Sequence, residues 1–475
     1  MTTSPTLAFL PEWILLAGAL VLFVLTLGQD GGRAARRAAL VISLATIVGC
    51  LLAFGQQALL FDAAYKVDGF SQLLKLVFAV GFTLILLLSG DVIDIRPEAK
   101  PEYFLFLTLS VLGLVMLVSS IELITLVVAL ELSSFPLYFL VAMRRERTGQ
   151  RTQMEAAIKY MMFGIAANGI MFFGLSYLFG MTGSTALPAM AVRLQPLLHS
   201  PLAIAGLAMA FCGLYYKLAV FPFHFWTPDV YQGASNETAS LVASLPKVGA
   251  VAVLVRFVSL ASPENRPIEV MLTVLAVASM FYGNLVALLQ NDFKRMLGFS
   301  GIAHAGYAVI GFVSLERQGY AAALYYIVGY VFMVLACFAV ISRVSKDGGN
   351  VSLTDLAGLH RRSPLLSLTL LVGVFALAGL PPFPGFLGKL SLLKAALAKG
   401  HVTLVILAVI NSAIAIGYYL RVVRESCFKE AGDQTPLPLD LSTRVLCWGV
   451  MAAIVVLGVA PARILDLIST ALAAV

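Results

Sequence analysis

The apolar runs of this sequence constrain its fold more than any other feature. A helix needs about 20 mostly apolar residues to cross a bilayer, and about fourteen stretches come near that length. With 12% charged residues and a mean hydropathy of +0.94, the composition excludes a soluble or secreted enzyme. The expected spans lie near residues 7–28, 38–56, 71–90, 102–119, 121–143, 155–180, 202–226, 238–259, 268–290, 295–314, 319–342, 364–398, 402–424 and 444–466. The sequence therefore predicts an all-α polytopic membrane protein whose single integral membrane domain covers residues 1–475.

Positive charges in the loops favour an even number of spans. If the N-terminus is outside, the inner loops carry nineteen lysines and arginines and the outer loops and ends carry seven, which obeys the positive-inside rule. The inner set is Arg33, Arg36, Arg37, Arg96, Lys100, Arg144, Arg145, Arg147, Arg151, Lys294, Arg295, Arg343, Lys346, Arg361, Arg362, Arg421, Arg424, Lys429 and Arg444. The outer set is Lys66, Arg193, Arg256, Arg266, Arg317, Lys399 and Arg463. We therefore expect both termini on the outer side, and we attribute the net charge of +7 to the inner loops and not to nucleic-acid binding.

The stretch GLYYKLAVFPFHFWTPDVYQGA, Gly213–Ala234, combines two features that are costly in a membrane helix. Lys217 would cost roughly 3 kcal/mol or more in hydrocarbon. Pro222 would leave backbone carbonyls without their helical partners. Together they predict a broken helix that lines a wet cavity. The long run 364–398 has a similar interruption, because the prolines of Pro381–Phe386 should separate two helical segments.

Glu131 is the one carboxylate expected deep in the membrane. It lies in VVALELSSFPLYFL with many apolar residues on both sides, so a misplaced span boundary does not explain it. We expect a functional or paired role for this side chain. Glu122 lies nine residues earlier, and nine residues turn a helix by about 900°, so it faces the opposite side. We expect Glu122 at the membrane interface.

Three lysines are expected in the membrane interior beside helix breaks. Besides Lys217, these are Lys247 in LPKVGAVAVL, directly after Pro246, and Lys389 in GFLGKLSLL. Loss of water favours the neutral form of a lysine, whereas a nearby carboxylate favours the charged form. Movement of Glu131 relative to Lys217 would therefore switch the lysine between holding and releasing a proton. The alternative is a static ion pair that only fixes helix packing.

The remaining ionisable side chains in the runs divide into interfacial lysines and candidate relay histidines. Lys75 and Lys394 lie near span ends and are expected to reach the interface. Lys159 stays open between an interfacial and a functional role. His224 follows the first break and His304 lies in GFSGIAHAGYAVIG, and both are candidates for a proton relay. The alternative for each histidine is a buried ring that is only hydrogen-bonded.

No motif for bond-making chemistry accompanies these groups. The sequence has no nucleophile elbow, phosphate loop, haem-attachment motif or iron–sulfur motif. Its five cysteines are scattered without a C-x-x-C pair, which predicts neither a metal site nor a disulfide framework. The pattern therefore indicates movement of protons or small cations, with no cofactor or metal in this chain.

Four segments carry a resemblance to a known family. YYKLAVFPFHFWTPDVYQGA, LPKVGAVAVL, NDFKRMLGFSGIAHAGY and LAGLPPFPGFLGKLSLL are similar, in this order, to the antiporter-like membrane subunits of respiratory complex I, the NADH–quinone oxidoreductase. The match runs from about Phe61 to Arg424. Within the family, the TPDVYQGA segment and the lysine at Lys389 resemble the N-type subunits. The chain also ends too early to hold the long lateral helix of the L type.

The resemblance implies a repeated architecture. Residues 102–260 would form one five-helix repeat, spans four to eight, and residues 267–428 would form a second, inverted repeat, spans nine to thirteen. Three helices in 7–90 would precede the repeats and one helix in 444–466 would follow them. Helices seven and twelve would be broken.

The resemblance also implies a function. Glu131, Lys217, Lys247 and Lys389 match the residues of a proton path that is driven by quinone reduction elsewhere in the complex. NADH, FMN, iron–sulfur clusters and quinone would belong to partner subunits, so this chain would do no redox chemistry itself. Its partners would be the other membrane-arm subunits, protons and the lipid of a bacterial plasma membrane.

One position departs from the family pattern, and two other functions stay open. The eighth helix usually starts with a proline-rich, uncharged segment, whereas this chain reads SNETAS over Ser235–Ser240 and places Glu237 there. Glu237 is either a group at which protons enter or an acid favoured by the helix dipole. The alternative functions are a subunit of an Mrp-type cation/proton antiporter and a structural membrane scaffold.

Overall fold

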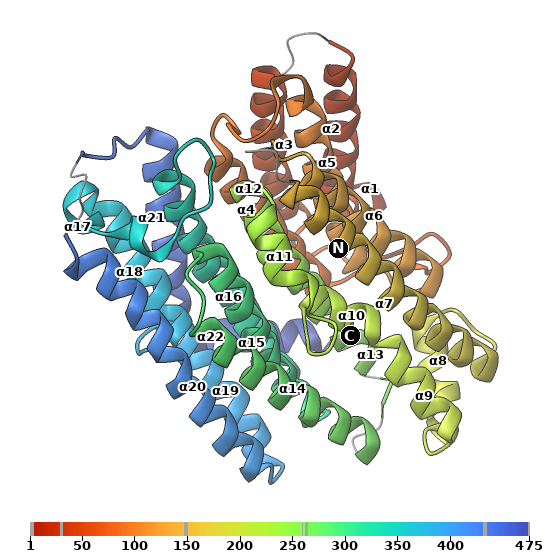
Figure 1. Ribbon diagram of the computed structural model, residues 1–475. Helices are drawn as coiled ribbons and strands as arrows, with labels where there is room; N and C mark the ends of the chain where they lie inside the picture. Colours follow the sequence, from red (N-terminus) through yellow and green to blue (C-terminus); the bar gives the residue numbers. More distant parts are fainter. Residues whose placement is uncertain are drawn as a thin grey trace.

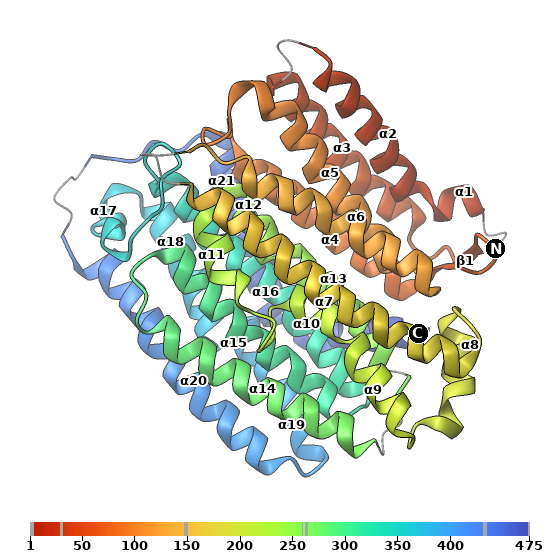
Figure 2. The ribbon, with the colours of Figure 1, turned by 45° about the vertical axis from the view of Figure 1, so that its right-hand side comes forward.

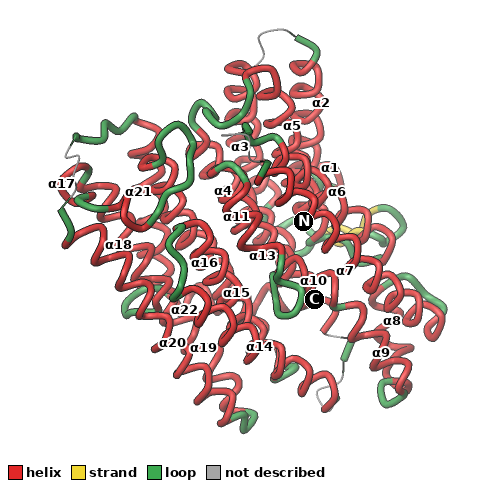
Figure 3. The backbone as a smooth tube through the Cα atoms, in the orientation of Figure 1, coloured by secondary structure: helices red, strands yellow, loops and turns green. Residues whose placement is uncertain are grey.

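Long helices that lie side by side make up nearly all of the structure (Figures 1 and 3). The structure is a computed structural model and describes residues 4–28, 32–146, 151–258, 260–261, 265–430 and 435–473. Twelve of the described helices are long and apolar enough to cross a membrane, and Leu10–Thr26 and Pro364–Ala378 are shorter apolar helices. The predicted helical membrane fold is confirmed, and the count of fourteen spans stays a prediction.

The helix bounds follow the predicted runs closely. In the first half the helices are α1 (Pro5–Ala8), α2 (Leu10–Thr26), α3 (Gly32–Ala53), α4 (Gly69–Ser89), α5 (Lys100–Leu117), α6 (Leu123–Ala142), α7 (Thr152–Thr182), α8 (Leu187–Leu194), α9 (Pro201–Ala210), α10 (Cys212–Leu218), α11 (Trp226–Gly233), α12 (Asn236–Ala243) and α13 (Leu245–Val258). In the second half they are α14 (Arg266–Ala287), α15 (Phe293–Val313), α16 (Arg317–Val344), α17 (Leu359–Arg362), α18 (Pro364–Ala378), α19 (Pro384–Ala398), α20 (Val402–Val423), α21 (Leu441–Val459) and α22 (Pro461–Leu472). Short 3-10 turns cover Pro97–Ala99, Gln195–Leu197 and Leu353–Leu356, and a π-helical turn covers Arg424–Phe428.

Both predicted proline breaks are present. The helix α10 ends at Leu218, Ala219 takes the left-handed conformation with φ 67°, and α11 starts only at Trp226. In the same way α18 ends before Gly379, which has φ 84°, and α19 starts at Pro384. A left-handed residue ends a helix because the ladder of backbone hydrogen bonds cannot continue through it. Each break therefore leaves carbonyl groups at the end of a half-helix inside the bundle.

The most buried helices lie at the centre of the bundle. The span formed by α12 and α13 and the helix α15 are buried along their whole apolar windows, and α16 is 94% buried. Helices α3, α14 and α20 have only about a third of their apolar windows buried, so they face lipid or partner subunits. Figure 2 shows α16, α13 and α15 behind the helices of the near face. The core helices also carry lysine and histidine, which places the ionisable groups in the middle of the protein.

Two elements differ from the predictions. A short antiparallel hairpin, β1 (Ala58–Leu60) and β2 (Tyr65–Val67), lies between α3 and α4, so the chain is not helical throughout. The last predicted span, 444–466, is too long, because α21 ends at Val459. After it α22 begins with Pro461, whose ring cannot continue the preceding helix, and packs against α4 and α16.

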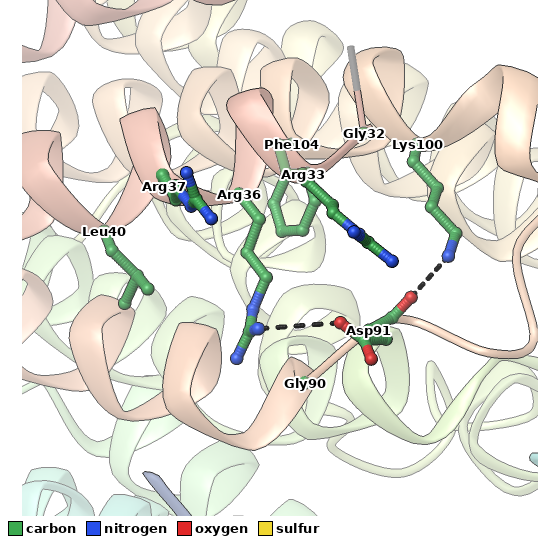
Figure 4. Close-up of a pocket in the computed structure, with 9 residues that line it drawn as sticks. All are labelled: Gly32, Arg33, Arg36, Arg37, Leu40, Gly90, Asp91, Lys100 and Phe104. Atoms are coloured by element: carbon green, nitrogen blue, oxygen red, sulfur yellow. Dashed lines mark hydrogen bonds and ion pairs between the residues drawn. The ribbon is translucent and has the colours of Figure 1, made fainter. Parts of the chain in front are cut away.

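Basic residues from separate loops meet at one end of the bundle. Figure 4 shows Arg33, Arg36 and Arg37 of α3 near Lys100, around a cavity of about 500 Å³. Arg36 Nη1 lies 3.7 Å from a carboxylate oxygen of Asp91, and Lys100 Nζ donates to the Asp91 carbonyl at 2.5 Å. The basic residues of two predicted inner loops therefore share one end, as alternating spans require. We name it the basic end.

Arg144 joins further loops at the basic end. Its Nε lies 2.6 Å from the Asp94 carboxylate, and its Nη groups donate to the carbonyls of Gln232, at 2.8 Å, and Gly348, at 3.0 Å. Arg147, also assigned to the inner set, lies outside the described residues. The elements α1, β1 and α8 lie at the other end of the helices, away from α17 (Figure 2).

Close helix packing in the first half gives a test of the fold. A Cβ at Gly174 of α7 would lie 2.4 Å from the Ala210 backbone nitrogen and 2.6 Å from the Gly206 carbonyl oxygen, whereas a Cβ at Gly169 meets nothing within 4 Å. Gly174→Ala should destabilise the protein by about 1–3 kcal/mol, since backbone atoms would have to move. The measurement is the thermal unfolding midpoint of the full chain in detergent. Gly169→Ala is the matched control, and an equal fall in both variants would contradict the packing.

Candidate functional site

Glu131 of α6 and Lys217 of α10 lie close together without a direct ion pair, since Lys217 Nζ reaches the carbonyl of the neighbouring Leu130. Glu131 is partly buried, and Asn168 of α7 donates its side-chain amide to Glu131 Oε1 at 2.6 Å. The carboxylate and the Lys217 ammonium group interact electrostatically. The structure thus brings together the two residues that the sequence analysis expected to act as a pair.

The Lys217 ammonium group is held by neutral acceptors next to Glu131. It donates to the Leu130 carbonyl at 3.3 Å, to Ser134 Oγ at 2.9 Å and to the hydroxyl of Ser133. Lys217 also lies in the last turn of α10, where the partial negative charge of a helix C-terminus favours a cation. The ammonium group therefore depends on Glu131 through the field of the carboxylate and has its hydrogen bonds to other groups. Such an arrangement permits the charge on Lys217 to change without the loss of a direct ion pair.

Lys247 lies in the centre of the bundle beside α15 and α16. Its Nζ donates to the Gly301 carbonyl at 2.8 Å and sits 5.3 Å from the centre of the Tyr330 ring. A Cβ at Gly301 would lie 3.0 Å from both Lys247 Nζ and Tyr330 Oη, and 3.6 Å from Tyr231 Oη. Glycine at this position therefore makes room for the ammonium group and two tyrosine hydroxyls.

His304 lies between Lys247 and Lys389. Its ring is close enough to interact electrostatically with both lysines. The Nδ1 atom is 2.5 Å from Tyr326 Oη, and Nε2 is 3.0 Å from Tyr419 Oη. Both ring nitrogens thus have a hydroxyl partner, and a ring with partners on both sides can accept a proton on one and release it from the other.

Lys389 lies against the end of the other half-helix. Its Nζ donates to the Ala378 carbonyl, the last of α18, at 3.3 Å and to Ser412 Oγ of α20 at 3.0 Å. The Tyr307 ring centre is 4.5 Å away. The break at Gly379 therefore leaves a carbonyl that accepts a hydrogen bond from a buried lysine. Lys217 likewise lies at the C-terminal end of a half-helix, α10.

His224 is placed differently from His304. Its ring contacts those of Phe221, Phe225 and Tyr282, with centres 4.3–5.3 Å apart. Neither ring nitrogen has a hydrogen-bond partner among the residues that the structure describes. The structure thus brings His304, but not His224, into a polar chain with the lysines.

The sequence analysis missed the buried ion pair between Glu12 and Lys75. Lys75 was expected at the interface, but it is fully buried and its Nζ lies 2.6 Å from Glu12 Oε1. Tyr65 donates its hydroxyl to the same oxygen at 2.5 Å. The expectation for Lys75 was wrong because a position near the span end does not reveal which other elements bury the side chain. Here Glu12 of α2 lies against it. Glu12 lies near the start of the first helix, where an acid usually only complements the helix dipole.

The other two uncertain residues have structural partners. Lys159 lies 2.7 Å from carboxylate oxygens of both Glu155 and Asp229, and Asp229 also pairs with Arg295 at 2.5 Å. Glu122 caps α6 by accepting the Thr125 N–H. Burial opposes the charged Glu122 carboxylate, but hydrogen bonds from Thr125 and Thr185 outweigh it and hold its pKa below the usual value. Glu122 therefore lies at the end of the span, as predicted.

The arrangement as a whole favours the transfer of protons. Lysine, histidine and tyrosine groups follow one another through the buried centre, and each lysine has neutral acceptors. Within the described part of the chain, no group of three or more histidine, cysteine, aspartate and glutamate side chains could hold a metal ion.

Comparison with known proteins identifies the family. The profile of the NADH:quinone oxidoreductase/Mrp antiporter transmembrane family matches residues 120–415. The chain is 62% identical over 469 residues to NADH-quinone oxidoreductase subunit N 2 of Opitutus terrae, with 98% of both chains covered. It is 42% identical over 453 residues to the protein of the same name in Syntrophobacter fumaroxidans, with 94% of this chain and 95% of that protein covered.

Solved structures agree with the sequence comparison. A chain of respiratory complex I from Thermus thermophilus with bound aureothin aligns with a TM-score of 0.83 at 32% identity, covering 97% of this chain and 99% of that one. A chain of the Mrp complex from Dietzia aligns with a TM-score of 0.86 at 20% identity, covering 99% of this chain and 97% of that one. The second likeness shows a shared fold alone.

The Glu12–Lys75 pair gives a test of the buried charges. Lys75→Met should destabilise the protein by about 3–5 kcal/mol, since it leaves the Glu12 carboxylate buried without its partner. Adding Glu12→Gln to that variant should recover much of the loss, because neither charge then remains. Thermal unfolding of the full chain in detergent measures both effects. Lys394→Met, at an exposed lysine, is the control, and a double variant no more stable than Lys75→Met would contradict the pair.

Proposed function

Because the chain belongs to the subunit N family of NADH–quinone oxidoreductases, we propose that it translocates protons through its buried row of ionisable side chains. The chain is an antiporter-like membrane subunit of respiratory complex I in a bacterial inner membrane. Its partners are other membrane-arm subunits of the complex. The observation that carries the proposal is the Lys217 ammonium group, held by neutral acceptors within the field of Glu131.

The Glu131–Lys217 pair acts as the switch of this path. While the carboxylate is close and charged, it stabilises a proton on Lys217. When helix movement weakens that interaction, burial favours the neutral amine, and Lys217 releases its proton. Glu131 belongs to α6 and its carboxylate is bound by Asn168 of α7, so a shift of these helices relative to α10 would change the interaction.

The second half of the path runs from Lys247 through His304 to Lys389. His304 interacts with both lysines, and its two ring nitrogens each face a tyrosine hydroxyl. Lys389 passes protons to the outer side. A relay role for His224 stays a prediction, since its ring is enclosed by aromatic side chains.

The chemistry that drives the path lies in other subunits. This chain contributes to a translocase as a subunit, and NADH, FMN, iron–sulfur clusters and quinone belong to its partners. The reduction of quinone in the partner subunits supplies the free energy for translocation. This chain responds to a change in the position or charge of groups at its contact with those subunits. An Mrp-type antiporter function has the same fold in its favour, but the relatives of high identity are subunits of NADH–quinone oxidoreductase.

The orientation follows from the basic end. We place the basic end at the cytoplasm and both termini on the outer side, since positive loops stay inside. Glu98 lies exposed near the basic end, and Asp62 lies exposed in the hairpin near the N-terminus.

Cysteine labelling tests this orientation. An impermeant maleimide should label Asp62→Cys in intact spheroplasts and Glu98→Cys only in inverted vesicles. The five native cysteines are buried or partly buried, so the background is low. The reverse labelling pattern would contradict the orientation.

Lys217→Ala tests the proposed function. It should abolish proton translocation by this subunit while the complex still assembles, because alanine holds no proton and its small side chain fits the site. NADH-driven proton uptake by inverted vesicles measures the effect, with assembly followed on native gels. Lys394→Ala, at an exposed lysine of α19, is the control. Pumping at the native rate with Lys217→Ala would sink the proposal and favour a structural scaffold.

A further inference from the structure

Glu237 is buried in a way that a helix-start acid does not require. It is the second residue of α12, near the basic end, and only 9% of it is exposed. The helix already has a cap, since Ser235 accepts the Thr238 N–H at 3.2 Å. Glu237 Oε2 is buried and has no hydrogen-bond partner among the described residues. Burial of a carboxylate oxygen without a hydrogen-bond partner destabilises the folded protein. A favourable interaction with the helix dipole alone therefore does not explain why an acid occupies this position.

The charges around Glu237 come from three other elements. Lys294 of α15 is fully buried and donates to the Ala234 carbonyl, just before the cap of α12, at 2.8 Å. Asp94 and Lys294 both act on the Glu237 carboxylate. Arg144 pairs with Asp94 at 2.6 Å. Asp292 also acts on Lys294. Glu237 thus lies in a buried layer of acids and bases, and a proton taken up by its carboxylate raises the charge of that layer by one.

A polar stripe leads from Glu237 to Lys247. Glu237, Ser240 and Ser244 are three and four residues apart, which places them on one face of α12 and its C-cap, and Lys247 follows three residues later in the first turn of α13. All four are buried. Ser240 Oγ donates to the Glu237 carbonyl at 2.7 Å, and Ser244 Oγ donates to the Ser240 carbonyl at 2.6 Å. Ten residues at about 1.5 Å each span about 15 Å, which takes the stripe from the basic end to the lysine.

The same neighbouring helix meets both ends of the stripe. At the first end Lys294 of α15 donates to the carbonyl beside the α12 cap, and at the other end Gly301 of α15 accepts from Lys247. The segment is also broken midway, because Ser244 ends α12 and Pro246 has no N–H to offer. Carbonyl groups near the break therefore lack their usual backbone hydrogen bond and can accept one from another donor. A buried polar stripe that runs beside a helix break is a suitable lining for a proton route.

We propose that Glu237 takes up protons from the cytoplasm at the basic end and delivers them to Lys247 along this stripe. The carboxylate gains a proton from water on that side, and the proton then passes to the neutral amine of Lys247. The inference rests on the proposed function and adds to it a proton intake that reaches the centre of the chain without Lys217.

The test compares variants of the intact complex in inverted membrane vesicles. Glu237→Gln keeps the size and polarity of the side chain but cannot carry a proton as the carboxylate does. We expect the rate of NADH-driven proton uptake to fall at least threefold, with the amount of assembled complex unchanged. Glu237→Asp should restore most of the rate. Glu98→Gln, which removes an exposed acid near the same end, is the matched control and should pump at the native rate.

A second variant keeps the inference testable if Glu237→Gln does not assemble. Ser244→Ala leaves Glu237 in place and removes a hydroxyl from the middle of the stripe, and it should lower the pumping rate at least twofold. Native pumping in Glu237→Gln, or in Ser244→Ala should the first variant fail to assemble, would overturn the inference. Loss of pumping in Lys217→Ala together with native pumping in Glu237→Gln would overturn the inference alone. If Lys217→Ala and Glu237→Gln both pump at the native rate, the proposed function is overturned together with the inference.

Discussion

The cost of placing charge in hydrocarbon shapes this protein more than any other interaction. Three lysines are buried inside the helical bundle, where each charged side chain would cost several kcal/mol without hydrogen-bond partners. They are Lys217, Lys247 and Lys389. The fold supplies those partners from neighbouring helices and, for Lys389, from the end of an interrupted helix. The end of α18 offers the Ala378 carbonyl to Lys389, and Lys217 occupies the C-terminal turn of α10. Helix breaks that would weaken an ordinary membrane span are therefore what makes buried lysines tolerable here.

The central position of α13, α15 and α16 follows from the same constraint. Polar groups on these helices must be kept from lipid, so the helices that carry them lie where other helices cover every face. Tyrosines complete the arrangement, because their rings fill apolar space while their hydroxyls reach His304. The peripheral helices α3, α14 and α20 leave most of their apolar windows uncovered by the rest of the chain. The proposed path thus lies in the core of the bundle and not in a cleft on its surface.

The sequence predicted those parts of the site that depend on position along one helix. Glu131 and Lys217 were recognisable because a charge in the middle of an apolar run is costly unless it is paired or functional, and the prolines predicted both breaks. The Glu12–Lys75 pair was not recognisable, since each residue lies near a span end and only the fold brings Glu12 of α2 to Lys75 of α4 and Tyr65 of the hairpin. The environment of Glu237 likewise depends on distant loops. The free-energy cost of placing a charged side chain in hydrocarbon identifies residues in the middle of a span. It does not show which side chains contact one another in the folded protein.

The measurement that tests this account most directly is NADH-driven proton pumping by inverted vesicles that carry Glu131→Gln. Glutamine keeps the hydrogen bond with Asn168 but removes the charge that acts on Lys217. Electron transfer is followed in the same sample, and assembly is checked beside it. The account predicts that pumping is lost in a complex that is fully assembled. Unchanged pumping would contradict it and would leave the buried charges as structural pairs.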